Sequence, residues 1–273
     1  MTTVTTTTMT GLTRVGANAL AKVFSRVSVA VVLCAAAGCS DGSGKNSDGG
    51  NDGVLCNTPD PGTAIDFLDD MEDGDGRILS RGGRSGQWYT YNDGTKEGIQ
   101  NPVPETVPAM ETIPGSRCTF STKAMRVSGS GFAEWGAGFG FDLLVDTSAG
   151  TWVRMPYNAV AAQARGITFW ARAGDPSITE FRVSLADKWT DPVGGQCDVT
   201  LTVGPTACYD NFGTNLQLTT TWQRFAFSWG QMSQRQFGLT RPALDTENLV
   251  AVHFTVPNGP VFDVWVDDVA FYQ

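Results

Sequence analysis

GITFWARAG, residues 166–174, is the stretch that decides the fold class. Its side chains alternate between two sets, Ile167, Phe169 and Ala171 in one and Thr168, Trp170 and Arg172 in the other. Successive side chains of an extended strand point to opposite faces of a sheet. The stretch therefore predicts a β-strand with one face directed towards a core.

The same alternation recurs further along the chain, at residues 181–186, 222–229 and 250–256. Gly and Pro separate these runs throughout the body of the chain, and no long amphipathic helical pattern competes with them. We find no internal repeat and no second shift in composition. The sequence therefore predicts an all-β fold, a two-sheet antiparallel β-sandwich, as one domain over residues 54–273.

The N-terminal segment has the pattern of an export signal. Arg14, Lys22 and Arg26 precede the apolar run 27–38, which is too short to span a bilayer permanently. The run ends in Ala36-Ala37-Gly38-Cys39, which resembles a bacterial lipobox. We expect residues 1–38 to be a lipoprotein signal peptide and Cys39 to be acylated. The alternative is an ordinary signal peptide with a spare thiol, and either Met1 or Met9 could be the start.

Residues 40–53 read SDGSGKNSDGGNDG and offer no apolar side chain to a core. We expect residues 39–53 to comprise the lipidated cysteine and a flexible linker. Attachment through acyl chains would place the domain outside the cytoplasm as a membrane-anchored lipoprotein, at the periplasmic face or the cell surface. The sequence does not decide between the inner and the outer membrane.

The chain is acidic. Loss of the three basic residues of the signal takes the formal charge from −9 to −12. Such a body argues against nucleic acid and against adsorption to membranes through basic patches.

Four cysteines remain once Cys34 leaves with the signal and Cys39 is assigned to lipid. An even number in an oxidising compartment predicts disulfides. Cys197 and Cys208 flank a short Thr/Val-rich stretch that resembles a hairpin, so we pair them and assign Cys56 to Cys118 by elimination. Zinc is the rival, but the sequence has no CxxC and only one histidine, His253.

Acidic runs stand at both ends of the predicted domain, DFLDDMEDGDG at 66–76 and VWVDDVAFY at 264–272. If the first and last strands pair, these carboxylates meet at one end of that pair. Hard oxygen ligands gathered there would suit a structural Ca²⁺ ion that joins the termini. The alternative is a set of solvated turn residues.

Five segments together resemble a known family. They are DDMEDGDG (69–76), GQWYTYNDGT (86–95), GITFWARAG (166–174), TWQRFAFSW (221–229) and VDDVAFY (266–272). They resemble the carbohydrate-binding modules of the family-11 type and related galactose-binding-like domains. The resemblance implies a jelly roll, a calcium ion near the paired termini with Asp70, Glu72, Asp267 and Asp268 as ligands, and a concave sheet face that binds glycan. The segment 194–197 and its partner Cys208 do not belong to that pattern.

Glycan binding requires flat aromatic rings and planar hydrogen-bonding side chains. On the strand faces opposite the core, the candidates are Trp170, Arg172, Arg182, Trp222, Arg224 and His253, which would share one sheet if their strands are neighbours. Loop aromatics add Trp88, Tyr91 and Trp189 as candidates, and Tyr89, Trp135 and Tyr209 as a further supply.

These observations predict a membrane-tethered lipoprotein that binds polysaccharide without catalysis, presents glycan to envelope or glycan-degrading partner proteins, or holds the cell to a matrix. One rival is a glycan hydrolase or lyase, because Asp142, Asp146, Asp187, Asp191 and Asp210 could supply a carboxylate pair. No GxSxG motif is present. The other rival is a structural or adhesion lipoprotein without sugar binding.

Overall fold

The computed structural model describes residues 65–114, 121–176, 180–259 and 261–273. The predicted signal peptide, Cys39, the linker, Cys56 and Cys118 lie outside the described residues, so those predictions stay untested. In the described part of the chain the regular secondary structure is almost entirely β-strand. Its two 3-10 helices, η1 (Pro192–Gly194) and η2 (Trp229–Gln231), are single turns. None of the helices found in the described ranges is long and apolar enough to cross a membrane.

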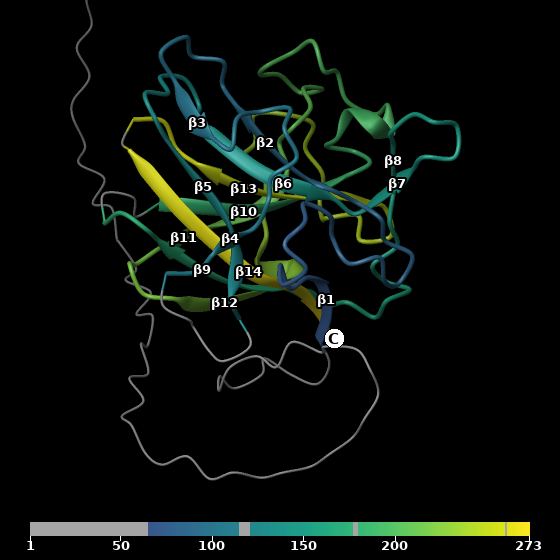
Figure 1. The fold of residues 1–273 in the computed structure, drawn as a ribbon. Helices are drawn as coiled ribbons and strands as arrows, with labels where there is room; N and C mark the ends of the chain where they lie inside the picture. The colour runs from purple at the N-terminus through teal and green to yellow at the C-terminus, as the bar shows by residue number, and fades with distance from the viewer. Residues whose placement is uncertain (1–64, 115–120, 177–179, 260) are drawn as a thin grey trace, which may run out of the picture. The chain divides into compact units, whose positions relative to one another are not determined.

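Two large antiparallel sheets form a sandwich (Figure 1). The seven-stranded sheet consists of β1 (Ile65–Asp69), β3 (Ile99–Asn101), β4 (Glu111–Thr112), β5 (Lys123–Ser130), β9 (Gly166–Ala173), β12 (Gln223–Ser228) and β14 (Phe262–Tyr272). The five-stranded sheet consists of β2 (Trp88–Asn92), β6 (Ala137–Asp142), β10 (Glu180–Asp187), β11 (Phe212–Gln217) and β13 (Leu249–Val256). A short pair, β7 (Leu144–Asp146) and β8 (Val153–Met155), stands apart. The predicted all-β sandwich is confirmed.

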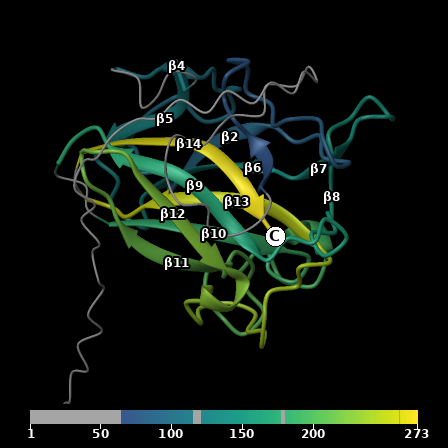
Figure 2. The same cartoon turned by 90° about the horizontal axis from the view of Figure 1, so that it is seen from below.

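The order of strands in each sheet brings distant parts of the sequence together. The larger sheet runs β12-β9-β14-β5-β3. The smaller sheet runs β11-β10-β13-β6-β2, which can be followed in Figure 2. In the larger sheet β1 pairs with the C-terminal part of β14, with Ile65 opposite Tyr272. The first and last strands of the described residues therefore pair, which is the condition on which the calcium hypothesis rests.

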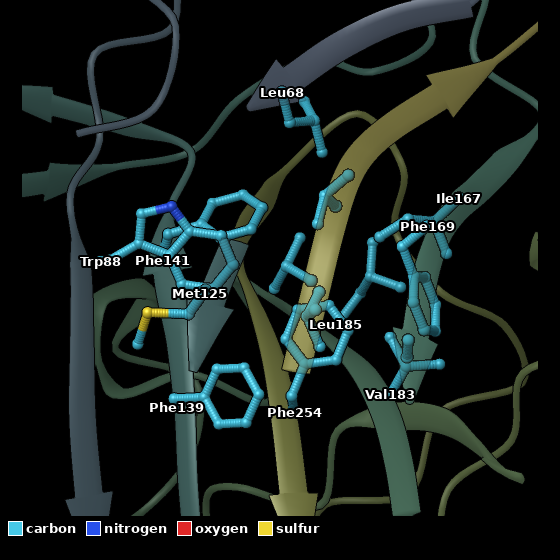
Figure 3. Packing of buried hydrophobic residues seen from close by; sticks show 14 of the residues in the cluster. Leu68, Trp88, Met125, Phe139, Phe141, Ile167, Phe169, Val183, Leu185 and Phe254 are labelled. Atoms are coloured by element: carbon cyan, nitrogen blue, oxygen red, sulfur yellow. The ribbon is translucent and has the colours of Figure 1, made fainter. Parts of the chain in front are cut away.

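The core lies between the sheets and is dominated by aromatic rings (Figure 3). Phe254 of β13 lies at its centre, with its ring centroid 5.1 Å from Phe169, 5.3 Å from Phe139 and 6.3 Å from Trp88. Aromatic pairs at these separations add about 0.5–1.5 kcal/mol each beyond burial.

Trp88 is fully buried, so its prediction as a ligand contact is wrong. Alternate side chains of β2 face opposite sides of the sheet, and Trp88 faces the core while Tyr89 and Tyr91 face away from it.

The six polar and aromatic candidates would share one sheet only if their strands were neighbours, and this condition is not met. β9 and β12, with Trp170, Arg172 and Arg224, belong to the seven-stranded sheet, and Trp222 directly precedes β12. β10 and β13, with Arg182 and His253, belong to the five-stranded sheet. Alternation along a strand fixes which side chains face the core, but it does not specify the partner strand.

The predicted Cys197–Cys208 disulfide is present, with Cα atoms 5.0 Å apart. The segment between the two cysteines, however, is a loop of turns rather than a hairpin. Turn hydrogen bonds join Leu201 N to Asp198 O and Ala207 N to Gly204 O. Gly204 and Pro205 interrupt the Thr/Val alternation, because glycine favours turns and proline cannot donate to a strand ladder.

Candidate functional site

The outer face of the five-stranded sheet carries two rows of side chains, set by the strand register. One row runs Tyr91, Gly138, Thr255, Arg182 and Asn215 across β2, β6, β13, β10 and β11. The next row runs Tyr89, Gly140, His253, Ser184 and Gly213. Neighbouring positions such as Phe139, Phe254 and Val183 face the core, so these rows face away from it.

Two glycines of β6 make room for aromatic side chains on this face. A Cβ atom added to Gly138 would lie 2.5 Å from the Tyr91 ring, and one added to Gly140 would lie 2.8 Å from Cδ2 of His253. Because β6 has no side chains at these two positions, the rings of Tyr91 and His253 meet across it, with centroids 5.5 Å apart. The sequence AGFGFD of β6 thus gives a strand with an apolar inner face and a bare outer face.

His253 is at the centre of a hydrogen-bond chain. Its Nε2 atom lies 2.8 Å from the Tyr89 hydroxyl, and its Nδ1 atom lies 3.1 Å from Nδ2 of Asn211. Burial lowers the pKa of His253 to about 4, so the ring is neutral at pH 7. With Asn211 donating to Nδ1, the single ring N–H is on Nε2 and donates to Tyr89, which leaves the Tyr89 hydroxyl hydrogen for another acceptor.

Arg182 is buried beside this chain. Its guanidinium donates to Oδ1 of Asn215 at 3.1 Å and to the carbonyl of Ser233 at 2.8 Å. Burial and, to a smaller extent, the charge of nearby Arg235 lower the pKa of Arg182 to about 10, and Asp210 opposes the change. These contacts fix a planar hydrogen-bonding group in the floor of the face.

A second guanidinium stands at the other end of the face. Nε of Arg154 donates to Oδ1 of Asp142, and its Nη2 donates to Oδ2 of Asp191, both at 2.7 Å. Burial disfavours the charged Arg154, yet the two carboxylates hold its pKa above the usual value. Burial raises the pKa of Asp142, and Arg154 offsets part of that rise. Two carboxylates therefore share one cation here.

These elements enclose a cavity of about 1290 Å³, here called the groove. Its lining includes the non-glycine members of both rows and residues from the loops, among them Trp135, Tyr209, Asn258, Val199, Leu201, Thr202 and Val203. Trp135 and Tyr209 are each 51% exposed, and the Trp135 ring centroid lies 6.0 Å from that of Tyr91. The groove thus combines exposed aromatic rings with a fixed polar floor.

The structure brings some of the predicted ligand residues together and separates the others. Arg182, His253 and Tyr91 line the groove. Trp170, Arg172 and Arg224 belong to the opposite sheet, and Trp222, which directly precedes β12, lies with its ring 5.7 Å from the Arg172 guanidinium. Trp189 is not in the lining either: its indole N–H donates to Asp245 and Arg241 covers its ring at 4.0 Å.

Sequence reasoning missed Arg154, Asn211 and Asn215, which shape the groove. Asn211 directly precedes β11. Its role depends on a hydrogen bond to His253 of β13, a contact between distant residues that sequence spacing does not encode. A signal for the groove itself was present in β6. Glycines at alternate positions of a strand with Phe at the others indicate a face on which other side chains or a ligand approach the backbone.

The predicted metal ligands lie where the terminal strands meet. Glu72 accepts hydrogen bonds from the backbone N–H groups of Thr122 and Lys123, at 2.8 and 3.0 Å. Ser121, adjacent to Thr122, donates its hydroxyl to buried Asp267 at 2.6 Å. Glu72 and Asp267 are therefore linked through two consecutive residues.

The other two predicted ligands are engaged locally. Asp70 accepts from Glu72 N, and Asp268 N donates to Oδ1 of Asp267. Neighbouring Asp69 is fully buried and accepts from Trp88 Nε1 at 2.6 Å, and burial raises its pKa to about 8. Within the described ranges, no three His, Cys, Asp or Glu side chains form a cluster that could hold a metal. Carboxylate oxygens are the ligands that Ca²⁺ prefers, but the described side chains do not converge into a ligand set.

No family model and no curated protein matches the chain. Solved structures do. The family 11 carbohydrate-binding module of the cellulase Lic26A-Cel5E of Clostridium thermocellum matches with a TM-score of 0.47 at 14% identity, over 78% of this chain and 96% of that one. The family 30 module of the Clostridium thermocellum cellulase Cel9D-Cel44B matches with a TM-score of 0.43 at 13% identity, over 73% and 97%.

A third structure, the module TmCBM61 in complex with β-1,4-galactotriose, matches with a TM-score of 0.37 at 10% identity, over 77% of this chain and 99% of that one. The family 11 match is to the family that the sequence motifs resemble, and the likeness is one of β-sandwich fold. At these identities and TM-scores it carries nothing about a ligand. The function of the groove has to be inferred from its own residues.

Proposed function

We propose that the groove binds a polysaccharide chain without catalysis. The observation that carries the proposal is the joint presence, in one cavity of about 1290 Å³, of exposed rings and fixed polar groups. Tyr91, Trp135 and Tyr209 offer flat surfaces to the C–H faces of sugars. Arg182 and the Tyr89 hydroxyl offer hydrogen bonds to sugar hydroxyls.

The floor of the groove is held in place before any ligand arrives. Tyr89, His253 and Asn211 are joined by hydrogen bonds, and Arg182 is fixed by Asn215 and by backbone carbonyls. Side chains that are already ordered lose little conformational entropy on binding. This supports recognition of an extended ligand by a preformed surface.

The carboxylates of the groove support binding over catalysis. Asp142 and Asp191 share Arg154, and Asp210 accepts hydrogen bonds from the backbone of Arg235 and Gly238. A glycosidase requires one carboxyl group to deliver a proton and another to act on the sugar or on water. Incubation with polysaccharides should therefore release no reducing ends and no unsaturated products; release of either would favour the hydrolase or lyase rival.

The binding test is calorimetric titration of the purified protein against a panel of soluble polysaccharides. Trp135→Ala should weaken binding to the best ligand about tenfold, equivalent to about 1.4 kcal/mol, because a stacking surface is lost. Ile99→Ala is the control, since Ile99 is 67% exposed on the other sheet. If no polysaccharide binds, the adhesion rival without sugar binding is favoured.

We further propose that acylation of Cys39 tethers the domain to a membrane, outside the cytoplasm. The lipobox-like sequence 36–39 supports this proposal. Tethering at a surface raises the effective concentration of weak sites, which suits glycan capture and presentation to envelope or glycan-degrading partner proteins. Expression with a labelled fatty acid should mark the native protein, and Cys39→Ser should lose the label and leave the membrane fraction. A labelled Cys39→Ser variant would contradict the assignment.

A structural Ca²⁺ ion near the paired termini is a separate proposal. The proximity of Glu72 and Asp267 through Ser121 and Thr122 supports it. An ion that binds only the folded state at 100 times its dissociation constant stabilises that state by about 2.7 kcal/mol. EDTA should therefore lower the melting temperature and added Ca²⁺ should restore it. An unchanged transition would contradict the proposal.

A further inference from the structure

The loop between Cys197 and Cys208 forms an apolar wall of the groove. Val199, Leu201 and Val203 line the cavity and are 55%, 38% and 70% exposed. Large aliphatic side chains that stay exposed side by side in a cavity indicate a site that buries them against a ligand. The proposed glycan stacking by aromatic rings does not account for them.

The loop is held rigidly in position. The disulfide closes it, and Asp198 N donates to Thr206 O at 2.7 Å inside it. Gly204 N donates to Phe237 O, and Leu239 N donates to Ala207 O, both at 2.9 Å, which ties the loop to the segment that follows η2. The three aliphatic side chains are therefore presented on a preorganised backbone.

The wall and the floor of the groove differ in chemistry. The floor presents Arg182 and the Tyr89–His253–Asn211 chain, whereas the wall presents mainly hydrocarbon, from Val199, Leu201 and Val203, with Thr202 as its one hydroxyl-bearing residue in the described lining. A ligand that fits both must carry hydroxyl groups on one side and apolar groups on the other. Unsubstituted sugar edges, which are rich in hydroxyls, would lose hydrogen bonds to water against this wall.

The charges of the groove indicate an uncharged ligand. Its described lining holds the carboxylates of Asp142, Glu180, Asp191 and Asp210 and the guanidinium groups of Arg154, Arg182 and Arg235. Arg154 lies between two of these carboxylates, and Asn215 donates to Glu180. The cavity thus has no excess of cations that would select an anionic substituent.

We infer that the groove selects glycan chains bearing small uncharged acyl groups, such as O-acetyl esters, and that the disulfide-closed loop recognises those groups through Val199, Leu201 and Val203. The inference rests on the proposed glycan binding and names the substrate class of that site. Each acetyl methyl group buried against the wall should tighten binding about fourfold, equivalent to about 0.8 kcal/mol.

The test uses acetylated xylan and acetylated glucomannan, each titrated before and after removal of its esters with mild alkali. The native protein should bind the acetylated form of a polymer at least fourfold more tightly than the deacetylated form. A carboxymethylated derivative of the same polymer should show no such gain. The double variant Val199→Ser, Val203→Ser should lose the gain and keep the affinity for the deacetylated form.

The matched control is the double variant Val103→Ser, Val107→Ser, which removes the same groups from positions 58% and 53% exposed outside the groove. It should retain the preference. Equal binding of both polymer forms by the native protein, or an undiminished preference in the Val199/Val203 variant, overturns this inference and leaves the proposed function standing. Failure of every form to bind overturns both.

Discussion

The outer faces of the two sheets are built from similar residue types but differ in form. On the seven-stranded sheet, Trp265 of β14 is only 2% exposed, and the guanidinium groups of Arg126 and Arg172 lie over its ring at 5.0 and 5.4 Å. On the five-stranded sheet, the rows contain Gly138 and Gly140, and the face opens into the groove. A binding face therefore depends on where small residues leave room, more than on how many Trp and Arg residues a strand carries.

The outer face of the seven-stranded sheet is here called the filled face, and the groove side of the five-stranded sheet is called the open face. The largest effect should follow from a substitution in the filled face. Trp265→Ala removes a buried indole and the surface on which two arginines stack, so it should lower the free energy of unfolding by about 3–5 kcal/mol. The groove lies on the other sheet, so the protein that remains folded should bind glycan with unchanged affinity. Urea denaturation and calorimetric titration measure the two quantities. A loss of affinity in the folded variant would show that the two faces are coupled.

The second prediction concerns the polar floor of the open face. His253 has a pKa of about 4 in the folded protein against an ordinary value of 6.5, so the unfolded state binds more protons between these values. Its contribution to stability is therefore present above pH 6.5 and is lost as the pH falls from 6.5 towards 4, by up to about 3 kcal/mol.

The measurement is the free energy of unfolding at a series of pH values, for the native protein and for His253→Gln. Acidic side chains elsewhere titrate alike in both proteins, so the difference between the two curves isolates the histidine. The native protein should lose more stability than the variant between pH 6.5 and 4. Parallel curves would mean that His253 is not desolvated in the folded state.

The two faces also differ in how far the sequence predicts them. Alternation at residues 166–174 and 250–256 correctly places Phe169 and Phe254 in the core, because burial imposes a period of two on each strand. Pairing β9 with β14 and β10 with β13 depends on long-range contacts, which local alternation does not encode. That is why Arg172 and Arg182, equivalent in pattern, belong to different faces.

The third prediction concerns a substitution that adds a side chain to the open face. Gly140→Val places a branched side chain against the His253 ring and the backbone of Val252, so it should cost about 1–3 kcal/mol of stability and abolish glycan binding. Gly230→Val is the control, because a Cβ atom there meets nothing within 4 Å. Thermal denaturation and titration check both variants. Native affinity in Gly140→Val would show that the ligand does not reach the floor of the sheet.

The smallest effect should come from a single cation on the filled face. Arg172→Met keeps the apolar stem but removes the charge over Trp222 and Trp265, so it should lower the free energy of unfolding by about 1 kcal/mol, the worth of a partly buried cation–π contact. Its glycan affinity should be native.

Arg182→Met, the equivalent change in the groove, should instead weaken binding about tenfold, because a hydrogen-bonding group that faces the ligand is lost. If Arg172→Met weakened binding and Arg182→Met did not, the ligand site would belong to the seven-stranded sheet.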